Sequence, residues 1–108
     1  MRNIGNIIGI PWYNRKNYQA LLAIFPDRNN FPSTFDDWKE RANNHIRQQL
    51  QKGVIYYRVV IRPAEIQAYC AALGLEINGL ARIRYVNETL KGRLDRGDIA
   101  LRLNPPLK

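Results

Sequence analysis

Apolar side chains recur at helical spacing in four separate stretches of the chain. The stretches are flanked by residues that commonly begin or end helices, such as asparagine, threonine, proline and glycine. Residues 11–14 lead into the first stretch, with Asn14 as its expected N-cap. Thr34 is the expected N-cap of the second helix, and Gly53 and Gly74 are expected to end the second and third helices. The pattern predicts helices over residues 14–25, 34–52, 63–73 and 78–94.

The stretch between the second and third helices has a different pattern. Residues 54–62 read VIYYRVVIR and are dense in β-branched and aromatic side chains, which predicts a strand. One side of this strand carries Tyr56, Arg58 and Arg62, and we expect it to face solvent or a partner. The opposite side is apolar and consists of Ile55, Tyr57, Val59 and Ile61.

A single strand needs a partner, because its backbone donors and acceptors would otherwise stay unpaired. Three partners are available. They are residues 99–103, where Ile99, Leu101 and Leu103 alternate with other residues; residues 4–10; and residues 54–62 of a second subunit.

The predicted fold class is therefore α+β, mainly α. The element order is helix–helix–strand–helix–helix around one small sheet of two or three strands, completed by the C-terminal tail or by a second subunit. Residues 1–10 form either a flexible arm or an edge strand, and residues 95–108 form either a tail strand or a disordered tail. Gly92 offers an earlier end to the last helix.

The length of 108 residues suits one domain spanning residues 1–108. No apolar run approaches the roughly 20 residues of a membrane span, and the N-terminus does not resemble a signal peptide. The single cysteine cannot form an internal disulfide. These features favour a cytoplasmic protein, most simply a bacterial one, that does not enter a membrane.

Positive charge is the least ordinary bulk property of the chain. Seventeen Lys and Arg residues stand against nine Asp and Glu residues, which gives a formal net charge of +8. Helical spacing predicts that Leu80, Ile83, Val86 and Leu90 line the buried side of the last helix. Its other side is expected to carry a cationic rim that includes Arg82, Arg84 and Lys91. Such a charge attracts nucleic acid, acidic proteins or anionic surfaces without choosing among them.

Residues that perform catalysis are scarce. His45 has no acid or nucleophile near it in sequence, and Cys70 lies on an apolar helix face, where a thiol is inert. Asp36 and Asp37 are adjacent at a helix start and are better explained as capping residues than as metal ligands. The sequence therefore predicts no enzyme activity, no metal site and no cofactor.

Part of the chain resembles a ribbon-helix-helix DNA-binding unit. The resemblance lies in residues 58–66, in the Gly74-Leu75 pair and in the helix that follows. It implies that two subunits pair their strands in a homodimer through residues 54–62 and place this ribbon in the major groove. It also implies groove contacts by Tyr56, Arg58 and Arg62, and phosphate contacts by Asn78 and Gly79.

Residues 11–90 also resemble a group of small bacterial proteins with no established activity. The shared features are Trp12-Tyr13-x-Arg15-x-x-Tyr18, Phe35-Asp36-Asp37-Trp38, the strand-to-Pro63 junction, and Tyr69-Cys70 before Gly74-Leu75. This resemblance implies domain limits and no function.

We therefore expect a small non-enzymatic binding protein with nucleic acid as its ligand. The alternative is a protein–protein adaptor or inhibitor module whose basic surface meets an acidic protein partner. The nucleic-acid-binding residues predicted from the sequence are Tyr56, Arg58, Arg62, Asn78, Gly79, Arg82, Arg84 and Lys91.

Overall fold

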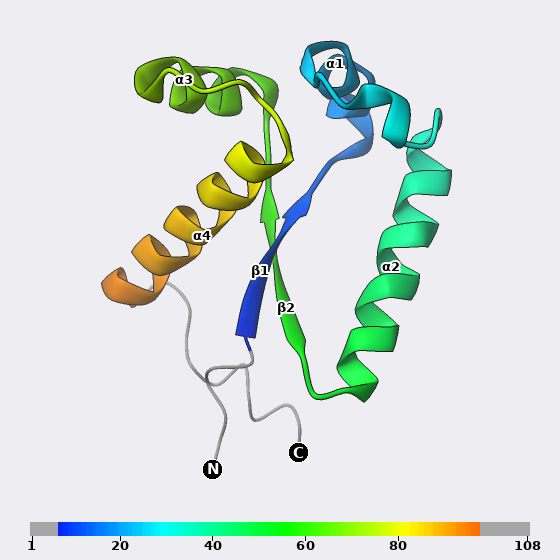
Figure 1. The fold of residues 1–108 in the computed structure, drawn as a ribbon. Coiled ribbons are helices and arrows are strands. Elements are labelled where there is room, and N and C mark those ends of the chain that lie inside the picture. The colour runs from blue at the N-terminus through cyan, green and yellow to red at the C-terminus, as the bar shows by residue number, and fades with distance from the viewer. Residues whose placement is uncertain (1–6, 98–108) are drawn as a thin grey trace.

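The computed structural model describes residues 7–97 and shows an α+β fold that is mainly α, as predicted (Figure 1). The four predicted helices are present, and a second strand precedes them. Two short 3-10 helices, η2 and η3, flank the first helix. In chain order the elements are β1 (Ile7–Trp12), η2 (Arg15–Asn17), α1 (Tyr18–Ile24), η3 (Arg28–Asn30), α2 (Phe35–Gln51), β2 (Ile55–Val60), α3 (Pro63–Leu73) and α4 (Gly79–Arg96).

The partner of the predicted strand is β1. The two strands run parallel, with a register from Ile7 opposite Ile55 to Trp12 opposite Val60. This strand overlaps one of the three predicted segments, residues 4–10, and extends beyond it to Trp12. The other predicted tail strand, residues 99–103, lies outside the described residues.

Pro11 lies inside β1, whereas the sequence predicted that it would lead into a helix. The amide of Ile61 donates to the carbonyl of Trp12 at 2.9 Å, so the polar groups of Trp12 point toward β2. Successive residues of a strand alternate in direction, and the nitrogen of Pro11 therefore faces the free edge of the sheet. Proline is tolerated there because no hydrogen bond is lost.

The sheet lies between two helices, with α2 on one face and α4 on the other (Figure 1). On the α4 face, Gly9 is so close to this helix that an added Cβ would lie 2.6 Å from Cγ1 of Val86. On the opposite face, the Trp12 ring is 4.8 Å from the Trp38 ring of α2, measured between centroids. The side of β2 that carries Tyr56 and Arg58 was expected to face solvent or a partner. Instead α2 packs against it, which leaves Tyr56 half-buried, while Arg58 remains exposed.

Aromatic side chains form much of the core where β1 leads into α1. The Tyr13 ring lies 4.8 Å from Trp38 and 5.7 Å from Phe25, and all three residues are buried. Tyr18 is also buried, and its hydroxyl donates to the carbonyl of Pro32 at 2.6 Å. The loop before α2 is thereby held against α1.

Several helix ends are as predicted. The hydroxyl of Thr34 accepts from the amide of Asp37, and Gly53 and Gly74 have the positive φ angles that favour glycine after a helix. Asn14 precedes η2 without a side-chain capping bond, so its predicted capping role is wrong. None of the helices within residues 7–97 is both long and apolar enough to span a membrane.

The buried face of α4 differs from the predicted one. Val86 and Leu90 are buried as expected, but Leu80 is 80% exposed and Ile83 is 50% exposed. Arg82 occupies the buried position instead, at 5% exposure. Gly92 does not end the helix, which continues to Arg96.

Candidate nucleic-acid interface

Arg58 of β2 lies beside α2 and is exposed. Its guanidinium carbon is 4.4 Å from the centroid of the Trp12 ring, and its Nη2 donates to Oδ1 of Asn43 at 3.1 Å. The stacking and the hydrogen bond hold the guanidinium in one place, while its positive charge has no carboxylate partner in residues 7–97. Arg58 is therefore an oriented and available cation.

Tyr56, two residues earlier on the same strand face, also meets α2. Its hydroxyl is 3.1 Å from Nε2 of His45, and the two ring centroids are 5.5 Å apart. Tyr56 is half-buried and His45 is exposed. One side of the Tyr56 ring is therefore covered by His45, and only part of the ring is open to a ligand.

Arg82 does not lie on a cationic rim, contrary to the sequence prediction. Its Nη1 and Nη2 donate to the two carboxylate oxygens of Asp27 at 2.9 and 2.7 Å. The guanidinium also lies 4.1 Å from the Phe25 ring centroid, and Nη1 donates to the carbonyl of Ile77. Arg82 therefore stabilises the core, because its charge is paired with Asp27 and three of its five N–H groups donate within the chain.

Arg84 and Lys91 are exposed on α4, as predicted, and each has an acidic partner one turn later. Nε of Arg84 is 3.0 Å from Glu88, and Nζ of Lys91 is 2.9 Å from Asp95. The hydrogen bond from Arg84 lowers the pKa of Glu88 below its ordinary value. These pairs partly neutralise the cationic rim.

The remaining predicted contacts lie at helix starts. Arg62 precedes α3 and is 3.7 Å from Glu65. The side-chain oxygen of Asn78 accepts from the amide of Ala81 at 3.0 Å, so it caps α4, and Gly79 is the first residue of that helix. The structure brings Tyr56 and Arg58 together beside α2, and it places these three residues elsewhere.

The sequence analysis missed a basic face on α2. Arg41, Arg47 and Lys52 are exposed, and none of the three has an ion pair within the described part of the chain. Arg47 donates to the side chain of Asn44, and the helical spacing places Gln48 on the same outer side. We call this set, Arg41, Asn44, Arg47, Gln48 and Lys52, the α2 basic face.

A signal for this face is present in the sequence. Residues 41–62 contain five Lys and Arg residues and no Asp or Glu. The acidic residues of α2 are confined to its beginning, where Asp36 binds Arg15 at 2.7 Å. Acidic groups at the start and cations toward the end of a helix also suit its dipole.

No cluster of three or more His, Cys, Asp or Glu side chains that could bind a metal ion occurs in residues 7–97. Cys70 is buried, and burial raises the pKa of its thiol, which disfavours the reactive thiolate. On the surface, the described residues present the exposed cations of the α2 basic face and Arg58, which is held by Trp12 and Asn43.

The other edge of β2 has no strand partner among the described residues. Pairing of residues 54–62 with a second subunit, and hence a homodimer, stays a prediction. The order of β2, α3 and α4 is the order expected from the ribbon-helix-helix resemblance, although β2 pairs in parallel with a strand of its own chain.

No protein-family model, curated protein or solved structure matches this chain.

Proposed function

We propose that this protein binds nucleic acid through the α2 basic face together with Arg58. The observation that carries the proposal is the contrast between the two exposed basic helices. On α2, Arg41, Arg47 and Lys52 have no acidic partner within residues 7–97, whereas on α4 Arg84 and Lys91 are paired. Unpaired cations are free to bind phosphate groups.

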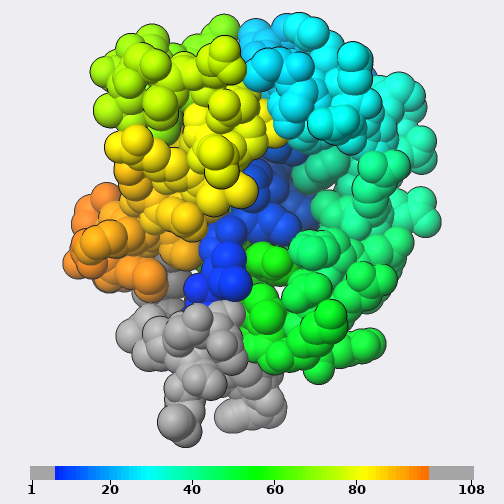
Figure 2. Space-filling view, in the orientation of Figure 1, coloured from blue at the N-terminus to red at the C-terminus, as the bar shows by residue number. Residues whose placement is uncertain are grey.

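The arrangement of the α2 basic face supports contact with a phosphate backbone. Arg41, Arg47 and Lys52 span about three turns of one helix, a distance of roughly 16 Å at 1.5 Å per residue. Phosphates of a duplex strand are separated by several ångströms, so several of them fit along this length. Asn44 and Gln48 add neutral hydrogen-bond donors between the cations. In Figure 2, α2 forms the right-hand side of the molecule and its outer face is open.

Arg58 and Tyr56 extend this surface toward β2. Arg58 is held by Trp12 and Asn43 and presents a planar guanidinium, the group best suited to two-point contact with phosphate. Tyr56 is half-buried beside His45 and contributes a partly open aromatic ring. The position of both residues supports a contact to phosphate or sugar at the edge of α2.

The test measures binding of mixed-sequence single-stranded and duplex DNA and RNA by fluorescence anisotropy over a range of salt concentrations. Phosphate binding predicts that the logarithm of the affinity falls linearly with the logarithm of salt, by about 0.9 for each duplex phosphate contacted. The double substitution Arg41→Gln with Arg47→Gln should reduce this slope by about two. The affinity should fall by at least about tenfold at low salt.

The matched control replaces Arg84 and Lys91 with glutamine, which removes the same amount of charge from α4. We expect a much smaller loss, because both cations are already paired with acids. If the control pair reduces the slope and the α2 pair does not, the binding surface lies on α4 and the proposal is wrong. Absence of binding to all four probes at low salt would overturn nucleic-acid binding altogether.

A further inference from the structure

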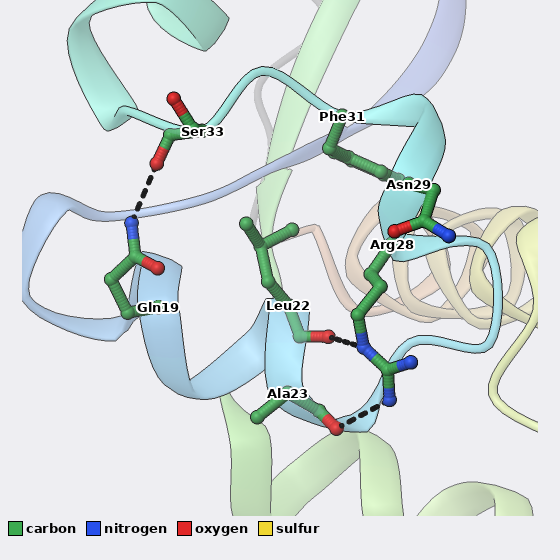
Figure 3. Close-up of a pocket in the computed structure, with 7 residues that line it drawn as sticks. All are labelled: Gln19, Leu22, Ala23, Arg28, Asn29, Phe31 and Ser33. Carbon is green, nitrogen blue, oxygen red and sulfur yellow. Dashed lines mark hydrogen bonds between the residues drawn. The ribbon is translucent and has the colours of Figure 1, made fainter.

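A pocket of about 440 Å³ opens between α1 and the loop that follows η3 (Figure 3). It shares no residue with the α2 basic face, and its volume lies within the range of small-molecule sites. Its lining residues are Gln19, Leu22, Ala23, Arg28, Asn29, Phe31 and Ser33.

The lining combines an apolar part with one cation. Leu22, Ala23 and Phe31 supply apolar surface, and Arg28 is the one charged residue among those that line the pocket. The neighbouring carboxylate of Asp27 does not neutralise Arg28, because both of its oxygens accept from Arg82. The pocket therefore favours a ligand that is apolar in one part and anionic in another.

Arg28 is held in place before any ligand arrives. Its Nε donates to the carbonyl of Leu22 at 3.2 Å, and its Nη2 donates to the carbonyl of Ala23 at 3.1 Å. Both carbonyls belong to the last turn of α1, and that of Leu22 also accepts from the amide of Phe25 at 3.2 Å. A guanidinium has five N–H groups, so these bonds leave the two on Nη1 and one on Nη2 for an anion.

The polar rim suits a carboxylate. Asn29 lies next to Arg28, and Ser33 lies across the pocket, where its carbonyl accepts from Gln19 at 2.9 Å (Figure 3). The side chains of Asn29 and Ser33 add neutral polar groups to the lining of the pocket. Charge-assisted hydrogen bonds from arginine to carboxylate are stronger than neutral ones, and holding Arg28 in advance reduces the entropy lost on binding.

We propose that this pocket binds a carboxylate carried on a branched or aromatic apolar group. The carboxylate contacts Arg28, and the apolar group lies against Leu22 and Phe31. This chemistry has two sources, the C-terminus of a peptide that ends in an apolar residue and a free organic acid. The inference does not depend on nucleic-acid binding, because the two sites have no residue in common.

The test uses the full chain labelled with ¹⁵N and follows its amide resonances during titration with three probes. N-acetyl-leucine represents a peptide C-terminus, 4-methylpentanoate represents a free acid, and N-acetyl-leucinamide lacks the charge. We expect saturable shifts at Arg28, Asn29 and Phe31 with at least one of the two acids and none with the amide. Tighter binding of N-acetyl-leucine identifies a peptide terminus, and tighter binding of 4-methylpentanoate identifies a free acid.

Arg28→Gln should weaken binding by about tenfold or more, the loss expected for a charge-assisted hydrogen bond. Because Arg28 also binds the end of α1, a second variant keeps the test valid if this one fails to fold. Asn29→Asp changes an exposed amide into a carboxylate and should weaken binding several-fold by repulsion. Asn87→Asp makes the same change on α4, away from the pocket, and should leave binding unchanged.

Three results would overturn the inference. The first is equal binding of the amide and the acids, which would show that charge is not recognised. The second is undiminished binding by a folded Arg28→Gln or by Asn29→Asp. The third is a set of shifts confined to the α2 basic face. Arg47→Gln, which should weaken nucleic-acid binding, should leave the titration with carboxylates unchanged, so the two proposals fail separately.

Discussion

Arg82 and Asp27 form a two-point ion pair that joins residues 55 positions apart in the chain. The guanidinium donates to both carboxylate oxygens, at 2.9 and 2.7 Å, and its side chain is 6% exposed. The pair connects α4 to the segment between α1 and η3, and the guanidinium also lies against the Phe25 ring. The ion pair therefore holds the segment between α1 and η3 in a fixed position against α4.

Arg82→Met should destabilise the protein by about 3 kcal/mol, since it leaves the carboxylate of Asp27 partly buried without its partner. Removing the carboxylate with Asp27→Asn should cost a similar amount, because a nearly buried guanidinium then loses its counter-charge. Urea unfolding followed by circular dichroism measures both free energies of unfolding.

The double variant, Asp27→Asn with Arg82→Met, serves as the control. If the two groups stabilise the fold mainly through each other, the double variant should be clearly more stable than the sum of the two single losses predicts. Strict additivity would show that the pair is not the source of the stability.

The same pair predicts a dependence of stability on acid pH. The hydrogen bond from Arg82 lowers the pKa of Asp27 below its ordinary value of 3.8. A carboxyl group whose pKa is lowered by folding stabilises the protein above its unfolded pKa and loses this effect as the pH falls through the folded pKa. The free energy of unfolding should therefore decrease below about pH 4.

Asp27→Asn should show a weaker acid dependence than the parent chain. A residual dependence should persist, since Asp36 and Glu88 also have lowered pKa values from their partners Arg15 and Arg84. Identical profiles of the parent and of Asp27→Asn between pH 2 and pH 7 would contradict the prediction.

Alkaline pH should act through Tyr13. Burial raises the pKa of this phenol to about 12. A group whose pKa is raised by folding contributes its stability below the unfolded pKa, about 10 for tyrosine, and loses it as the pH rises through the folded value. The protein should thus lose stability from about pH 10 upward, and ultraviolet absorbance should show one tyrosinate forming late. In Tyr13→Phe the latest step should disappear.

Most helices could be predicted from the sequence because their signals are local. Apolar spacing, the Thr34 cap and the glycine at the end of α3 each act within a few residues, and all three agree with the structure. The first strand was predicted only as one of three alternative partners, over residues 4–10, because its own local signal is weak. It has six residues, which include Gly9 and Pro11, and both are unfavourable in a strand by themselves. The reason for Gly9 is its close approach to α4, and the strand is identified by its pairing with β2.

For the site residues too, local patterns do not reveal contacts between residues that are far apart in the sequence. The exposure of Arg58 follows from strand alternation, but the burial of Arg82 depends on Asp27, which is far away in sequence. Helical spacing alone assigned Leu80 to the core and Arg82 to the surface, and the ion pair reverses this assignment. The basic face of α2 was visible as the absence of acidic residues from 41 to 62, a signal of charge rather than of periodicity.

Gly9→Ala should destabilise the protein by about 1–3 kcal/mol, the usual cost of overpacking a core. The added Cβ would lie 2.6 Å from Cγ1 of Val86, closer than two such carbons approach each other. Thermal unfolding measures the loss. Combining Gly9→Ala with Val86→Ala removes the overlapping atom, so the double variant should lose less stability than the two single losses added together. An additive result would show that the loss of stability in Gly9→Ala does not come from the overlap with Val86.

Arg58 and Arg82 provide a direct comparison, since both were predicted to bind nucleic acid and each can be changed to glutamine with the same loss of charge. Arg58 is exposed and contributes a stacking contact with Trp12, so Arg58→Gln should cost no more than about 1 kcal/mol of stability. It should also reduce the salt slope of nucleic-acid binding by about one. Arg82→Gln should do the opposite, with a large loss of stability and an unchanged slope under conditions where the protein stays folded. A reduced slope for folded Arg82→Gln would mean that the guanidinium leaves Asp27 to bind phosphate.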